Sequence, residues 1–524
     1  RQAQQARHRH LLVDELQDLT PAHVLMIRLL ATPGLDVFGV GDDDQVIYGH
    51  AGADPSVLID FGRLFPGAAS HPLEVNYRCP EVVVGAARHL LSYNDRRVAK
   101  EIRPGPHAAI GSDRLVIRRH RSQEGGTAVL ATVRGWLDDG ARPATIAVLA
   151  RVNSLLLAPH VVLAQAGVPI DSAADPSILE RTGVRAALAY LRIASSPRGF
   201  SPDDVNEVLR RPSRGLPQWI SKWFRGRSMS VGDVRAVASR LDDFKVAAKV
   251  ESLADDLDLV AKAAAGGGSA RDVLIAVKEQ VGLGSAMGLL DATGPAGSGS
   301  HLDDLEALLQ VADLHPDPGG FEPWLRSVFR REAAAGGITV STVHRVKGME
   351  WDRVAVFGVA DGIVPHRLAD DVEEERRVLH VAITRGREHI AVLVDQDRPS
   401  PFLGELDGTA ARGDVKPPGR VPAAPATATS GTKTGMSSDD LQASLPAEAA
   451  AVFAALREWR TAKAKQEKVS AFIVAPNRLL HAIALARPTT MVELSHVHEM
   501  GARRLESYGD EILSVVAGTE AGQI

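Results

Sequence analysis

Short aliphatic runs that alternate with longer helical segments constrain the fold of this chain more than any other feature. The runs "RHLLVDE" and "LDVFGVGDDDQ" are too short for typical helices and end in acids or glycine. Between them, "PAHVLMIRLLA" has helical spacing and Pro21 near its start. This alternation predicts an α/β layer fold whose buried parallel strands present functional residues at their carboxyl ends.

Later segments extend this pattern and divide the chain. Further strands are predicted at "RLVIRRH", "TIAVLAR", "ITVSTVH", "DRVAVFGV" and "HIAVLV", and helices at "GVRAALAYLRIA" and "EERRVLHVAITRG". Residues 197–330 are mostly helical in pattern and are interpreted as an insertion. Residues 404–437 are rich in Pro, Ala, Gly and Thr and are predicted to be a linker. A compact helical segment follows at 438–518.

Composition limits the class of protein and its partners. A length of 524 residues predicts roughly three or four domains. The single cysteine, Cys79, excludes a disulfide framework and a four-cysteine zinc site, and favours a cytoplasmic location. The net charge of −5 means that a nucleic acid must be held by local basic patches. No apolar run reaches membrane-spanning length, so no membrane partner is predicted.

In the stretch "LLVDELQD", a predicted strand ends directly at a cluster of acids. Metal-assisted phosphoryl transfer requires such residues: Asp14 would hold Mg²⁺ beside nucleotide phosphates, and Glu15 would orient and deprotonate the attacking water. The alternative is a strand end with solvated acids. The remaining motifs decide between these two interpretations.

Four other stretches offer groups that suit a nucleotide or a nucleic acid. In "VGDDDQVIYGHAGAD", Gln45 could contact a γ-phosphate and a water, and Tyr48 and His50 offer rings for stacking. In "LEVNYRCP", Tyr77 suits a base and the planar fork of Arg78 suits a phosphate.

The other two stretches lie towards the end of the α/β region. "STVHRVKGMEWDRV" joins two predicted strands through a tight turn at Gly348, and "EEERRVLHVAITRGREHI" is a charged helix that delivers Arg385 and Arg387 near its end. Taken singly, each stretch could be a solvated surface.

In this order, the motifs closely resemble those of the UvrD/Rep/PcrA family, the superfamily 1 DNA helicases. The resemblance covers residues 10–400 and involves motifs II to VI. It implies two RecA-like lobes of the P-loop NTPase class, with ATP between them and a helical arm inserted in the second lobe. The implied divisions are a first-lobe remnant at 1–72, a second lobe at 73–196 and 331–403, and the arm at 197–330.

The resemblance also implies residue roles. Asp14 would be the Mg²⁺ ligand, Glu15 the catalytic carboxylate and Gln45 the γ-phosphate sensor. Arg78 and Arg385 would be the two γ-phosphate arginines. Three further residues would complete the nucleotide and DNA contacts: Tyr77 would stack on the base, Glu350 in the turn at Gly348 would contact the ribose, and His344 would act with Tyr48 and His50 where single-stranded DNA is bound or coupled to ATP.

The chain departs from the family pattern at several positions. His50 replaces the usual Trp, which predicts weaker but retained base stacking. The arm has "SRGLPQW" where the family has a "GIG" hairpin, and Pro217 removes a backbone donor for duplex phosphate. A basic-aromatic patch is still expected there, although a helix face packed on the lobe is an equal alternative. Its residues are Arg210, Arg211, Arg214, Trp219, Lys222 and Trp223.

The family's phosphate loop, G-x-x-x-x-G-K-[ST], does not occur in this sequence. The chain starts at Arg1 in what reads as the end of a polar helix, so an N-terminal truncation is expected. The predicted function is an ATP-dependent DNA helicase or translocase, 3′→5′ by resemblance, that acts on single-stranded and junction DNA with possible DNA repair partners. The alternative is a non-catalytic DNA- or protein-binding module derived from a helicase.

The C-terminal segment resembles an HRDC domain, a small all-α bundle found on some helicases. The resemblance rests on "KVSAFIVAPNRLL", "RPTTMVEL" and "GARRLESYGDEIL". Basic residues there could bind single-stranded DNA, although an inert basic surface is the alternative. They are Arg460, Lys463, Lys465, Lys468, Arg478, Arg503 and Arg504.

Overall fold

A computed structural model of the chain contains two compact units, Arg1–Val421 and Pro422–Ile524, which are described separately. The structure describes residues 10–31, 36–171, 176–226, 228–293, 300–411, 447–467, 475, 477–495, 497, 500 and 502–521.

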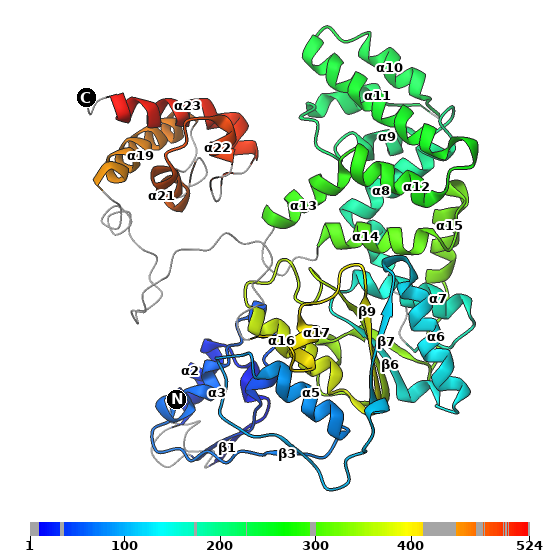
Figure 1. Ribbon diagram of the computed structural model, residues 1–524. Helices are drawn as coiled ribbons and strands as arrows, with labels where there is room; N and C mark the ends of the chain where they lie inside the picture. Colours follow the sequence, from blue (N-terminus) through cyan, green and yellow to red (C-terminus); the bar gives the residue numbers. More distant parts are fainter. Residues whose placement is uncertain are drawn as a thin grey trace. The chain divides into compact units, whose positions relative to one another are not determined.

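The first unit begins with a strand–helix–strand segment, as predicted (Figure 1). Strands β1 (His10–Val13) and β2 (Asp36–Gly39) pair in parallel. Helix α2 (Pro21–Leu30) connects them, and it begins where the Thr20 hydroxyl accepts a hydrogen bond from the His23 amide. The short helices α3 (Ser56–Ile59) and α4 (Phe61–Leu64) complete a small core around Leu16, Val24 and Val57.

A five-stranded parallel sheet forms the second lobe, with strand order β5-β9-β8-β6-β7. All five residues of β6 are buried, as expected of a strand covered on both faces. A short parallel pair, β3 (Val75–Asn76) and β4 (Arg103–Pro104), precedes the sheet. The other elements of this lobe are β5 (Leu115–His120), β6 (Ile146–Ala150), β7 (Thr339–Thr342), β8 (Trp351–Val359), β9 (Gly386–Asp395), α5 (Glu81–Leu91), α6 (Gly125–Asp138), α7 (Leu157–Gln165), α16 (Val372–Ile383) and α17 (Phe402–Leu406).

Two details of this lobe differ from the sequence predictions. The charged helix α16 ends at Ile383, so Arg385 follows the helix and Arg387 lies in strand β9. The lobe also continues past residue 403: Phe402 and Leu406 of α17 are buried in its core, and the Tyr93 hydroxyl donates a hydrogen bond to the Ala410 carbonyl. The predicted linker therefore starts too early at its N-terminal end, while the rest of it lies outside the described residues.

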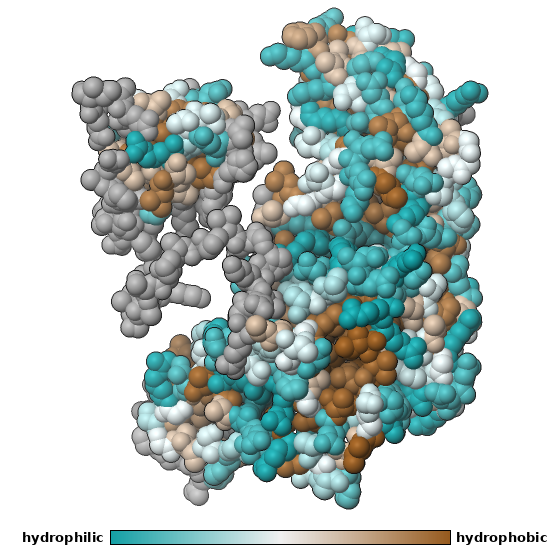
Figure 2. Space-filling view, in the orientation of Figure 1, coloured by the Kyte–Doolittle hydropathy of each residue, from teal (hydrophilic) through white to brown (hydrophobic). Residues whose placement is uncertain are grey.

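The inserted arm is helical, as predicted, and Figure 2 shows mainly hydrophilic residues on its visible face. Its core extends back to α7 and α8, since Leu157 and Tyr190 pack in the same cluster as Leu257 and Leu308. The helical layer thus begins before residue 197. Its helices are α8 (Thr182–Ser195), α9 (Pro202–Val208), α10 (Val231–Ala238), α11 (Phe244–Ala264), α12 (Ala270–Ile275), α13 (Leu283–Thr293), α14 (His301–Ala312) and α15 (Pro318–Phe329).

Within the described residues, no single helix has both the length and the apolar character needed to cross a membrane. One bent helix pair, Ala270–Gln280 with Leu283–Ala292, passes that test by length and composition alone. Val273, Val277 and Met287 of this pair are buried in the arm core.

The second unit is a small helical bundle, as predicted for the C-terminal segment. Helices α19 (Ala447–Glu467), α21 (Asn477–Ala486), α22 (Met491–Ser495) and α23 (Ala502–Ala521) surround a core of its own. Phe453, Leu456 and Leu480 are fully buried there. An independent core is the physical requirement for a domain that folds by itself.

Candidate nucleotide and DNA site

Asp14 and Glu15 directly follow strand β1, and both side chains are exposed. The Glu15 amide donates a hydrogen bond to Asp14 Oδ1 over 2.9 Å. Glu15 has a left-handed backbone (φ 50°, ψ 45°), which non-glycine residues seldom adopt and which is enriched at functional sites. The exposed Asp14 carboxylate is of the oxygen-ligand type that Mg²⁺ prefers.

Glu15 is joined to the next strand end through Gln17, whose side chain is buried. Gln17 Nε2 donates a short hydrogen bond to Glu15 Oε2, while Gln17 Oε1 accepts one from the Asp42 amide over 2.9 Å. Asp42 follows β2, so the two strand ends are linked as expected for neighbouring parallel strands.

The same hydrogen-bonded chain continues to the second lobe. Gln45 Nε2 donates to Asp42 Oδ2 over 2.8 Å, and Gln45 Oε1 accepts from a terminal nitrogen of Arg385 at 3.4 Å. A continuous path of hydrogen bonds therefore runs from Glu15 through Gln17, Asp42 and Gln45 to Arg385.

Arg385 is almost fully buried and its guanidinium also donates to the carbonyls of Val381 and Met349. Burial, together with the positive charge of Arg78, lowers its pKa to about 10, so it remains charged at neutral pH. The structure thus places Arg385 at the junction of α16 with the first lobe.

Arg78 and Glu350 contact each other: Arg78 Nε donates to Glu350 Oε2, and Arg387 lies 3.3 Å from Glu350 Oε1. Glu350 is therefore engaged by two arginines. The Tyr77 side chain is 79% exposed and lies against Gly105, where an added Cβ would come within 3.0 Å of the ring. The edge of the ring at Cδ1 therefore lies near Gly105, while most of the side chain stays accessible.

Lys347, which the sequence analysis did not select, bridges the two lobes. Its ammonium lies 2.6 Å from Asp18 Oδ1, 3.7 Å from Glu15 Oε2 and 2.9 Å from the Gln45 carbonyl oxygen. It also lies 5.5 Å from the centre of the Tyr48 ring. The sequence feature that could have identified Lys347 is its position directly before Gly348, whose positive φ of 86° forms the predicted turn.

Tyr48, His50 and His344 form one ring cluster, with centroids 6.0–6.1 Å apart. The Tyr48 hydroxyl donates to the His344 carbonyl over 2.6 Å. Burial lowers the pKa of His344 to about 3, so its ring is neutral. Between Tyr48 and His50, the Gly49 amide donates a hydrogen bond to the Glu374 carboxylate over 2.9 Å.

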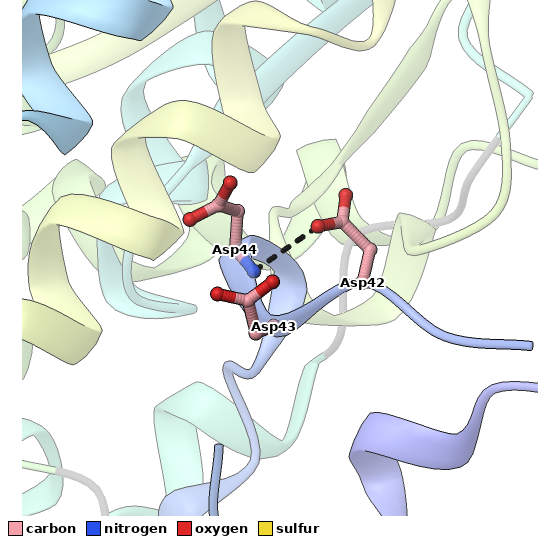
Figure 3. A group of neighbouring side chains, drawn as sticks. All are labelled: Asp42, Asp43 and Asp44. Carbon is pink, nitrogen blue, oxygen red and sulfur yellow. Dashed lines mark hydrogen bonds between the residues drawn. The ribbon is translucent and has the colours of Figure 1, made fainter. Parts of the chain in front are cut away.

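Three consecutive carboxylates, Asp42, Asp43 and Asp44, gather beside the site (Figure 3). The Lys100 ammonium lies 2.5, 2.6 and 3.0 Å from them respectively, and Arg97 binds Asp44 through two nitrogens at 2.7 and 2.8 Å. Because Lys100 already occupies the space between these oxygens, the cluster does not fit a metal ion.

In the arm, the predicted basic-aromatic patch divides into two groups. Arg214 is mostly buried and donates to Asp256, to the Tyr190 hydroxyl and to the Val208 carbonyl, so it stabilises the arm. By contrast, Trp219 is exposed. Arg210, Lys222 and Trp223 are exposed as well. An open cavity of about 660 Å³ lies nearby and is lined in part by Arg210, Arg211 and Arg225.

The C-terminal bundle uses some of its predicted DNA-binding residues internally. Lys463 forms an ion pair with Glu511, and Arg460 donates to the Ala475 carbonyl over 3.0 Å. Helix α23 includes Arg503 and Arg504, but their side chains lie outside the described residues. The side chains of Lys465, Lys468 and Arg478 do as well.

The lobes, the inserted arm and the joined strand ends define a class of protein, the two-lobed helicase-like α/β proteins. Comparison with known families supports this assignment: the UvrD/REP helicase N-terminal domain model matches residues 1–66, the UvrD-like helicase C-terminal domain model matches 71–248 and 326–396, and the HRDC domain model matches 449–516. The two helicase models together match more than half of the chain. The chain therefore belongs to the UvrD-like helicase family.

Individual relatives agree with this assignment. The chain is 28% identical to the ATP-dependent DNA helicase UvrD2 of Mycobacterium tuberculosis, over 98% of this chain and 68% of the relative. It is 27% identical to DNA helicase II of Escherichia coli, over 76% and 59%, and 24% identical to the ATP-dependent DNA helicase PcrA of Staphylococcus epidermidis, over 77% and 58%. The chain thus spans about two thirds of UvrD2 and somewhat over half of the other two.

Proposed function

We propose that this protein is an ATP-dependent DNA helicase or translocase. The observation that carries the proposal is the hydrogen-bonded path from Glu15 to Arg385, because it connects a candidate water-activating acid with a charge-stabilising arginine from the other lobe. The names of the relatives, which are ATP-dependent DNA helicases, support the same activity.

Each residue has a chemical task in this proposal. Asp14 would hold Mg²⁺, which neutralises charge on the phosphates when bound, and Glu15 would accept the proton of the attacking water. Arg385 and Arg78 would stabilise the charge that develops on the γ-phosphate. Tyr77 would stack on the base, and Glu350 beside Gly348 would contact the ribose once Arg78 turns towards the phosphate.

The ring cluster of Tyr48, His50 and His344 would contact single-stranded DNA. Its link to the nucleotide side is Lys347, which touches both the Tyr48 ring and the Gln45 carbonyl. Trp219 and its exposed basic neighbours in the arm would contact duplex DNA at a junction. The proposal includes a 3′→5′ polarity of movement. It also includes DNA repair proteins as partners and a cytoplasmic, nucleoid-associated location.

Two forms of the protein test it. The first is the chain itself, which has no G-x-x-x-x-G-K-[ST] sequence and is expected to bind single-stranded DNA but to hydrolyse ATP negligibly. The second, the loop-bearing fusion, is the whole chain preceded by the phosphate-loop segment of the M. tuberculosis relative.

The loop-bearing fusion is expected to show DNA-stimulated hydrolysis and to displace a strand from a duplex with a 3′ tail. A fusion that binds DNA but neither binds nor hydrolyses ATP would instead favour a non-catalytic binding module. Turnover at ~1 s⁻¹ by the chain alone would contradict the requirement for the loop.

A further inference from the structure

We infer that Asp42 and Lys100 are positioning residues for Gln45: the Asp42 carboxylate fixes which end of the Gln45 amide faces Arg385, and Lys100 fixes the carboxylate. The inference rests on the proposed function, because it assigns the residues that orient the γ-phosphate sensor. Neither residue was selected from the sequence.

The orientation of the Gln45 amide follows from its two neighbours. An ionised carboxylate can only accept hydrogen bonds and a guanidinium can only donate them. Gln45 therefore turns its NH₂ group to Asp42 Oδ2 at 2.8 Å and its carbonyl oxygen to Arg385 at 3.4 Å. The reversed amide would place oxygen against oxygen on one side and donor against donor on the other.

Asp42 is itself held at three points. Its Oδ1 accepts from Lys100 Nζ at 2.5 Å and from the Asp44 amide at 3.2 Å, and its own amide donates to Gln17. Burial opposes ionisation of Asp42, but the charge and hydrogen bond of Lys100 outweigh it and lower the pKa of the carboxyl to about 2. Asp42 is therefore an acceptor throughout the neutral range.

Lys100 comes from the segment between α5 and β4 of the second lobe, so it reaches across to the end of strand β2 in the first lobe. With Arg97 it places two positive charges against the three carboxylates of Asp42, Asp43 and Asp44. His380 packs against the same cluster from α16, and burial lowers its pKa to about 4, so it adds no charge at neutral pH. The charge of Arg385 also acts on Asp42, so three cations face the three carboxylates.

The Gln45 background separates positioning from folding. Asp42→Asn removes a carboxylate whose pKa is lowered in the folded chain, so it should also lower the free energy of unfolding. The Asn amide keeps an oxygen for Lys100 but presents NH₂ to Gln45, which must then rotate its own amide and turn a donor towards Arg385. Turnover should therefore fall only in variants that retain Gln45, whereas a merely structural loss would appear with and without Gln45.

The test measures kcat and KM for DNA-stimulated ATP hydrolysis in the loop-bearing fusion, which contains the whole chain. Asp42→Asn should lower kcat roughly 10- to 100-fold, the effect of removing one hydrogen bond to a charged group, with little change in KM. In a Gln45→Ala background the same substitution should have no further effect, because the residue acts through Gln45. Lys100→Gln should likewise lower kcat in the parent and have no further effect in the Gln45→Ala background. Arg88→Met, in an exposed pair 3.8 Å from Glu101, is the matched control and should match the parent.

Two results would overturn the inference: an unchanged kcat in Asp42→Asn, or an equal loss with and without Gln45. Either is distinguishable from failure of the proposed function, in which Glu15→Gln would leave hydrolysis unchanged.

Discussion

The Lys347 ammonium lies 2.6 Å from Asp18 Oδ1, and this ion pair joins the turn after β7 to the 3-10 turn after β1. The Lys347 side chain is only 8% exposed, so solvent screens the pair weakly. The same ammonium donates to the Gln45 carbonyl. One side chain therefore joins the turn after β7 both to the turn after β1 and to the segment that bears Gln45.

Replacing Lys347 with Met should weaken both folding and catalysis. Asp18 would lose a charged partner, so the free energy of unfolding of the chain should fall by about 1–3 kcal/mol. Urea denaturation measures this loss, and Lys245→Met, at an exposed position on α11, provides the control. Equal stabilities of the two variants would show that the bridge does not contribute to the fold.

The strands and most helices could be predicted because their signals are local. The run Ile146–Ala150 is apolar at every position, and α2 has its proline and polar cap in sequence. The candidate acids Asp14 and Glu15 also lie directly after a strand, as the sequence predicts. The sequence predicted Glu15, Gln45 and Arg385 on this path but not Gln17 and Asp42. The periodicity of apolar residues does not show which polar side chains hydrogen-bond to each other.

The other differences between prediction and structure arise from contacts between residues that are far apart in the sequence. Lys100 meets Asp42 only in the folded chain, and Arg214 was expected to face DNA because its partner Asp256 lies 42 positions away. Arg387 was placed on a helix because the charged segment continues beyond Ile383 into a strand. A single sequence contains no information on which distant charges pair.

Arg385 should be intolerant of lysine. The guanidinium donates in three directions, to Val381, Met349 and Gln45, and an ammonium lacks this planar fork. In the loop-bearing fusion, Arg385→Ala should reduce kcat by ~10³-fold or more, and Arg385→Lys should restore only part of it. Steady-state ATPase assays at saturating DNA measure both, and full activity of the lysine variant would contradict the role.

Stability should depend on pH through Asp304 at the start of α14. Burial raises its pKa to about 6, from 3.8 when unfolded, although Arg181 lies 2.7 Å away. Because the unfolded carboxyl releases its proton first, this residue destabilises the fold as pH rises from about 4 to 6. Relative to the parent, Asp304→Asn should gain roughly 2 kcal/mol in unfolding free energy between pH 4 and pH 7. Urea denaturation at both pH values checks this, with the exposed Asp138→Asn expected to show no such gain.

The C-terminal bundle should fold alone and bind single-stranded DNA weakly. Its buried core around Phe453 and Leu480 supports independent folding. For residues 438–518, replacing Arg503 and Arg504 with Ala should weaken binding. It should also flatten the plot of the logarithm of the binding constant against the logarithm of the salt concentration. The slope should fall by about 0.7 for each DNA phosphate that the variant no longer neutralises. Fluorescence anisotropy over a salt series measures the slope, and an unchanged slope would place the DNA-binding surface elsewhere.

The central claim is that Glu15 accepts the proton of the water that attacks ATP. The direct measurement is DNA-stimulated hydrolysis and ATP binding by the Glu15→Gln variant of the loop-bearing fusion. Gln is nearly the same size but cannot accept the proton, and Asp14 remains as the Mg²⁺ ligand, so hydrolysis should be abolished while ATP binding is kept. Hydrolysis at the parent's rate would contradict the assignment of Asp14 and Glu15 as the catalytic pair.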